Sequence, residues 1–131
     1  MHAQTIIEVI DTSPLNRGLR GVDWLADNRN IPVVVDEDVT LFDYESAGMY
    51  QVHVLYKSRG RQAIDRAKEA FAEMFTKHNA SVIIGLVPDF RRDVKLVARW
   101  TGGKNTGLVE TEHGPCEVYV WTDEMWKRQQ S

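Results

Sequence analysis

The sequence has little of what several classes of protein require. It holds a single cysteine, Cys116, so no disulfide can form within the chain, and a reducing compartment is expected. It has no apolar run near the roughly 20 residues of a membrane helix. Its first residues also lack the basic start and long apolar core of a signal peptide. These absences predict a cytoplasmic chain that does not enter a membrane.

The sequence also has only a small excess of one sign of charge. The formal net charge is −3, which gives no general attraction to nucleic acid, so nucleic-acid binding is unexpected and any anion site must be local. The four histidines show no spacing typical of metal ligands, and no metal site is expected. The 131 residues hold no internal repeat or linker, which predicts one domain spanning residues 1–131.

What stands out is a strand, a basic turn and a long helix in succession. Residues 52–56 form a short apolar run rich in β-prone types, and Lys57-Ser58-Arg59-Gly60-Arg61 interrupts it with three cations around one glycine. From Gln62 to about residue 78, apolar residues recur at spacings of three and four, which predicts an amphipathic helix. The first N–H groups of such a helix and the nearby cations favour an anion. A solvated basic turn is the alternative.

The remaining segments predict an α+β protein. Ser13 and Pro14 resemble a helix start, and residues 36–38 form an acidic turn too polar to bury. Residues 123–130 form a short helix or a tail. The expected helices are 14–28, 62–78 and 91–101, and the expected strands are 5–10, 31–35, 39–44, 49–56, 81–87, 107–111 and 117–122.

Connection lengths predict how the strands pair. The three strands between residues 31 and 56 are joined by short turns and form an antiparallel meander. Two strand–helix crossovers between residues 52 and 101 imply a parallel pair at the centre of the sheet.

The basic turn resembles the pyrophosphate-binding turn of the GNAT N-acetyltransferase superfamily. Arg59-Gly60-Arg61 is similar to the opening of that turn, and the strand at 83–88 followed by a helix and Gly102-Gly103 is a second similarity. The segment Gly48 to His53 resembles short phage-encoded GNAT-like proteins. The resemblance implies the GNAT-like (acyl-CoA N-acyltransferase) fold, with a mixed, mostly antiparallel sheet of about six to seven strands and helices on both faces. It also implies that acetyl-CoA, as co-substrate, contacts Val54, Leu55, Arg59, Gly60, Arg61, Gln62, Ala63 and Arg91.

Two residues are candidates for proton transfer. His53 lies on the central strand, and the ordinary pKa of about 6.5 for histidine suits a general base near neutral pH. Tyr56 is a candidate general acid, with Tyr50 as another tyrosine near the expected cleft. The alternative for His53 is a histidine packed on the sheet, and for the tyrosines, core aromatics.

Two functions remain open at this stage. The first is transfer of an acetyl group from acetyl-CoA to a small-molecule or protein amine. The second is a GNAT-like protein without catalysis, such as a phage virion or assembly component with a homo-oligomeric or virion partner. Gln62, Ile64, Arg91 and Ala98 favour the second, because active members of the family prefer other residues there.

Overall fold

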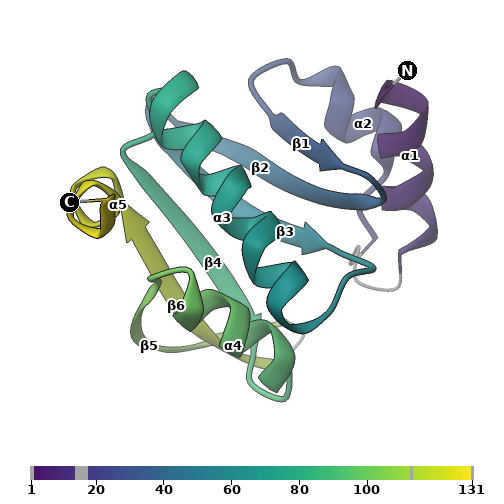
Figure 1. Ribbon diagram of the computed structural model, residues 1–131. Coiled ribbons are helices and arrows are strands. Elements are labelled where there is room, and N and C mark those ends of the chain that lie inside the picture. Colours follow the sequence, from purple (N-terminus) through teal and green to yellow (C-terminus); the bar gives the residue numbers. More distant parts are fainter. Residues whose placement is uncertain (1, 14–17, 113, 131) are drawn as a thin grey trace.

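A six-stranded mixed sheet with helices on both faces organises the molecule (Figure 1). The computed structural model describes residues 2–13, 18–112 and 114–130. The strand order is β1-β2-β3-β4-β6-β5. The strands are β1 Ile31–Val35, β2 Asp38–Ser46, β3 Met49–Leu55, β4 Val82–Pro88, β5 Lys104–Thr111 and β6 Gly114–Thr122. The helices are α1 His2–Thr12, α2 Gly21–Ala26, α3 Gly60–Lys77, α4 Arg92–Trp100 and α5 Asp123–Gln130. The α+β class and the mixed sheet are as the sequence predicted.

The sheet consists of two antiparallel halves that meet at one short parallel seam. Strands β1, β2 and β3 form the first half, and β4, β6 and β5 form the second. Only Met49–Gln51 of β3 pairs with β4, opposite Val82–Ile84. Beyond the seam the two strands spread apart in a V (Figure 1). The expected parallel pair is therefore present, but it ends halfway along both strands.

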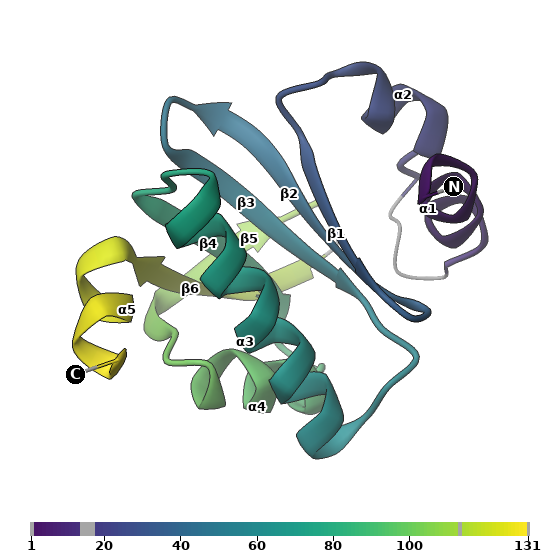
Figure 2. The same ribbon diagram turned by 45° about the horizontal axis from the view of Figure 1, so that its top comes forward.

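Helix α3 packs across both halves of the sheet, as the turned view shows (Figure 2). Its Phe71 ring lies 6.0 Å from the Phe42 ring of β2 and 4.7 Å from the Trp121 ring of β6. Small residues on the same helix stripe, Ala67 and Ala70, are also buried and bring the helix close to the sheet. One helix thus holds the two halves together from the face opposite α1 and α2.

Helices α1 and α2 cover only the first half of the sheet. Along β2, Val39 and Leu41 face these helices whereas Phe42 faces α3, as the alternation of a strand requires. Ile6, Ile10 and Trp24 complete this smaller core.

The prediction of a strand at residues 5–10 is wrong, because these residues form the middle of α1. Residues Ile6 and Ile10 are 2% and 0% exposed, and their spacing of four places them on one side of a helix. The β-branched composition misled the prediction, since packing against the sheet overrides propensity. The helix expected over 14–28 is shorter and begins at Gly21, while residues 14–17, with the predicted start at Pro14, lie outside the described residues.

Gly21 lets α2 approach the backbone of α1. A Cβ at this position would lie 2.6 Å from the Cα of Ile7, a distance that requires the helices to move apart. We expect Gly21→Ala to lower the free energy of unfolding by about 1–3 kcal/mol, as overpacking does. Denaturant titration would measure this, with Gly85→Ala as the control, because its Cβ would meet only side-chain atoms at 3.1 Å or more. An equal cost at both positions would contradict the explanation.

The chain ends with α5, which packs on α3 through the stacked rings of Trp126 and Phe75. The final hairpin is longer than expected, since β5 begins at Lys104 and β6 at Gly114. No helix among the described residues has the length and apolar character needed to span a membrane.

Candidate functional site

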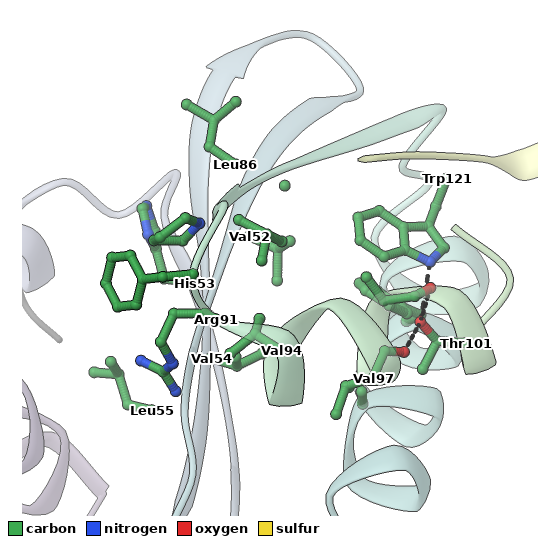
Figure 3. Close-up of a pocket in the computed structure, with 17 residues that line it drawn as sticks. Val52, His53, Val54, Leu55, Leu86, Arg91, Val94, Val97, Thr101 and Trp121 are labelled. Atoms are coloured by element: carbon green, nitrogen blue, oxygen red, sulfur yellow. Dashed lines mark hydrogen bonds between the residues drawn. The ribbon is translucent and has the colours of Figure 1, made fainter. Parts of the chain in front are cut away.

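The V between β3 and β4 opens a cleft of about 360 Å³. Residues 52–55 of β3 form one wall and residues 85–88 of β4 the other, and α4 closes one side (Figure 3). On the β3 side, these residues lie beyond the last pair with β4. The cleft thus exposes a strand on which both main-chain groups and side chains can meet a ligand.

The floor of the cleft is apolar and tightly packed. Gly85 lies against the Trp121 ring and Val52, each 3.1–3.3 Å from where a Cβ would be. The Trp121 indole N–H donates to Thr101 Oγ1 at 3.2 Å, and that hydroxyl donates to the carbonyl oxygens of Val97 and Ala98 (Figure 3). Thr101 was not recognised from the sequence. Ala98 of α4 also lines the cleft. It is 4% exposed, and its side chain has no proton to donate.

Asp38 fixes the turn that leads from β3 to α3. Its carboxylate accepts hydrogen bonds from the N–H groups of Lys57 and Ser58 at 2.8 and 3.0 Å, and from the Ser58 hydroxyl. Arg66 of α3 adds an ion pair at 3.2 Å. The expectation that residues 36–38 are too polar to bury is therefore wrong for Asp38, which is 4% exposed. Its partners compensate for the lost hydration.

The start of α3 is an uncapped, cationic helix N-terminus. No side chain caps it, and no acidic residue lies in its first turn. Gly60 has φ of 59°, a left-handed conformation in which other residues are strained. Within the described residues, the side chains of Arg59 and Arg61 are exposed and form no ion pair. The uncapped N–H groups at the start of α3 and the side chains of Arg59 and Arg61 thus lie close together.

A second cavity of about 50 Å³ lies at this helix start. Arg59, Gly60 and Ala63 line it from one side and Arg91 from the other. Gln62 is exposed and outside this cavity, and Ile64 lines a separate groove of about 510 Å³ between α3 and α4. The bulk of these two residues therefore does not enter the helix start.

Arg91 connects the two cavities and is held by Asp93. It lines both, and its guanidinium makes two hydrogen bonds to the Asp93 carboxylate at 3.0 and 2.9 Å. The hydrogen bonds from Arg91 lower the pKa of Asp93 to about 2 despite partial burial, so the carboxylate is charged at neutral pH. Arg91 is thus neutralised locally, unlike Arg59 and Arg61.

His53 lines the cleft between β3 and β4 and is paired with a carboxylate. Its Nε2 lies 2.7 Å from Asp43 Oδ2, and the Trp24 indole N–H donates to Asp43 Oδ1. Asp43 and Trp24 were not recognised as site residues. The cross-strand alternation of β2 and β3 is the signal that could have found Asp43, since residues 41 and 43 share a face with His53.

Tyr56 does not line the cleft between β3 and β4. Its hydroxyl is hydrogen-bonded to Thr40 Oγ1, and it lines only the smaller cavity among those described. Burial raises the pKa of Tyr56 above its usual value. Its role as a general acid stays a prediction, and the proposal below does not depend on it. Among the described residues, no group of three or more His, Cys, Asp or Glu side chains is arranged to hold a metal ion.

Comparison with solved structures defines the fold. The aminoglycoside acetyltransferase AAC(6')-Ib in complex with coenzyme A superposes with a TM-score of 0.71 at 14% identity, covering 100% of this chain and 96% of that one. RimJ of Mycobacterium smegmatis, in complex with CoA-disulfide, has a TM-score of 0.71 at 12% identity and covers 93% and 78%. The chain has the GNAT fold.

A GNAT-family acetyltransferase from Bacillus anthracis agrees, with a TM-score of 0.62 at 14% identity over 93% of this chain and 89% of that one. No family model and no curated protein matches the chain.

Proposed function

We propose that the protein is an N-acetyltransferase that takes its acetyl group from acetyl-CoA. The observation that carries this proposal is the continuity between the cleft and the cationic helix start. Val54, Arg91, Val94 and Val97 line both cavities, so one elongated ligand with an apolar arm and a pyrophosphate would fill them together. Proteins of the same fold have been solved with coenzyme A or acetyl-CoA, which supports this choice of ligand.

The residues present fit such a ligand. The N–H groups of residues 60–63, with Arg59 and Arg61, would hold the pyrophosphate, since helix N-termini favour phosphate. The apolar arm would lie against Val94 and Val97. The main chain of Val54 and Leu55, beyond the seam, would polarise the thioester carbonyl in the manner of an oxyanion hole. These assignments are part of the proposal.

The reaction needs only proton transfer and alignment from the protein. The acceptor enters as an ammonium ion and loses one proton to His53, and the nitrogen lone pair attacks the thioester carbonyl carbon. The carbon–sulfur bond breaks, and the thiolate takes up one proton while the nitrogen loses its second. The sum is acetyl thioester plus ammonium giving amide, free thiol and one released proton. Alignment alone can supply about 7 kcal/mol or more of the barrier reduction.

Calorimetric titration with acetyl-CoA tests the proposal. We expect binding that weakens as salt is raised from about 0.01 M to about 0.15 M, because the screening length falls from about 30 Å to about 8 Å. A panel of amines would then be assayed for release of the free thiol. Absence of binding up to millimolar acetyl-CoA would overturn the proposal.

Asp93→Asn should strengthen binding. Asp93 lines the smaller cavity, where its carboxylate would repel a pyrophosphate, and it accepts two hydrogen bonds from Arg91. Removal of its charge frees Arg91 for the ligand, and we expect the Kd for acetyl-CoA to fall by about threefold to tenfold. Asp89→Asn is the control, since Asp89 pairs with Lys95 outside both cavities. A weaker complex in the Asp93 variant would show that its carboxylate supports the site.

A further inference from the structure

Three side chains form a hydrogen-bonded line from α2 to the cleft. The Trp24 indole N–H donates to one oxygen of Asp43, and the other oxygen lies 2.7 Å from His53 Nε2. Trp24 is 4% exposed, whereas the Asp43 and His53 side chains are 27% and 31% exposed. The line therefore begins in the core and ends at the edge of the cleft.

The strand register explains why these residues meet. Leu41 lies opposite His53, and Asp43 lies opposite Gln51, so Asp43 is a diagonal neighbour of His53 on the same face. Helix α2 covers that face and places the Trp24 indole beside Asp43. Each oxygen of the carboxylate has its own hydrogen-bond partner, which leaves the group little freedom to turn.

We infer that Asp43 is a positioning residue that fixes the tautomer of His53, and that Trp24 fixes Asp43. An ionised carboxylate only accepts hydrogen bonds, so neutral His53 must carry its proton on Nε2. The lone pair then lies on Nδ1, and within the described residues the hydrogen bond of the His53 ring is made through Nε2. Nδ1 is thus the ring atom that takes the proton of the acceptor ammonium. The catalytic part of this inference rests on the proposed acetyl transfer.

Trp24 makes the inference sharply testable. Indole N–H is a donor only, so in Asp43→Asn the amide oxygen must face Trp24. The amide NH₂ must then face His53 Nε2 and donate to it, which forces the histidine proton onto Nδ1. A single isosteric change should therefore invert the tautomer and block the atom that accepts the proton. A comparable carboxylate-to-amide change in a serine protease triad has this consequence.

The first test uses the protein without any substrate. Long-range ¹H–¹⁵N spectra of the histidine rings, assigned with His53→Gln, report which nitrogen carries the proton when the ring is neutral. We expect Nε2–H in the parent protein and Nδ1–H in Asp43→Asn. Trp24→Phe added to Asp43→Asn frees the amide to turn over and should restore Nε2–H. An Nε2–H signal in Asp43→Asn alone would overturn the inference.

The second test measures acetyl transfer in the same variants. We expect Asp43→Asn to lower kcat by about 100-fold or more, in the range of lost general-base catalysis, with the KM for acetyl-CoA within twofold of the parent value. In a His53→Gln background the same change should have no further effect on kcat. The double variant Asp43→Asn, Trp24→Phe should regain part of the activity, and thermal unfolding would show that it is folded.

Glu45→Gln is the matched control. It removes a carboxylate from the same strand, and Glu45 is exposed. We expect its kcat and its histidine spectrum to be unchanged. A tautomer change in Asp43→Asn with unchanged kcat would overturn the catalytic part of the inference and leave acetyl transfer intact. If the parent protein transfers no acetyl group, the proposed function fails, and the spectra still decide whether Asp43 positions His53.

Discussion

The double variant Arg59→Ala, Arg61→Ala is expected to bind acetyl-CoA at least about 100-fold more weakly than the parent protein. Both cations lie at an uncapped helix start, and neither is engaged with a carboxylate in the described part of the chain. Charge-assisted hydrogen bonds to phosphate are among the strongest in proteins, and loss of each costs about tenfold or more in affinity. Calorimetric titration at low salt would measure the change.

Lys77→Ala with Lys104→Ala is the matched control for this variant. Both residues are exposed, both lie outside the two cavities, and their removal changes the net charge by the same amount. Lys77 also lies at the opposite end of α3. We expect the control to bind acetyl-CoA within about threefold of the parent value. If both double variants lost affinity equally, long-range charge and not the helix start would account for binding.

Asp38→Ala is expected to lower the free energy of unfolding by about 3–5 kcal/mol. The change removes the common acceptor of two backbone N–H groups and one hydroxyl, and it takes away the buried partner of the Arg66 guanidinium. Breaking a buried ion pair by removing one partner has a cost of this size. Asp38→Asn should cost less, because one amide oxygen can still accept from Lys57 and Ser58.

The same carboxylate makes stability depend on pH. Burial alone would raise the pKa of Asp38, but the hydrogen bonds from Ser58, Lys57 and Arg66 outweigh it, and the pKa lies below its usual value. The stabilisation is therefore complete above the unfolded-state pKa of about 3.9 and is lost as pH falls through the folded-state pKa. The difference in thermal stability between the parent protein and Asp38→Asn should thus be largest near neutral pH and shrink below about pH 4.

Asp36→Asn provides the comparison for both measurements. Asp36 also pairs with Arg66, but its side chain is 80% exposed, so its ion pair should contribute little. A loss of stability in Asp36→Asn as large as that in Asp38→Ala would show that the combined negative charge of residues 36–38, and not the buried carboxylate alone, stabilises the turn from β3 to α3.

The central part of the fold could be predicted because local signals there agree with the tertiary arrangement. The meander from Ile31 to Leu55 consists of three segments rich in β-prone residues and joined by short turns, and α3 shows an unbroken helical stripe. The parallel seam followed from the crossover connections alone. The resemblance around Arg59-Gly60-Arg61 was sufficient to predict the GNAT fold, which the solved structures confirm.

The parts that could not be predicted depend on contacts between distant segments. Residues 5–10 form a helix because Ile6 and Ile10 complete a core with Trp24, a partner that their own composition does not indicate. Asp38 is buried because donors nearly 20 residues away converge on it. Asp43 gains a role only through the register of β2 on β3 and the position of α2.

Phe71, on the side of α3 that faces the sheet, affects the width of the cleft. Its ring touches Phe42 in one half of the sheet and Trp121 in the other, and it also lines the cleft. The seam that joins the halves is only three residue pairs long and offers little resistance to bending. The ring therefore lies between the two halves, and a change in its volume would alter how they pack against each other. A substitution at this one buried side chain would thus change the width of the cleft and leave every charged residue in place.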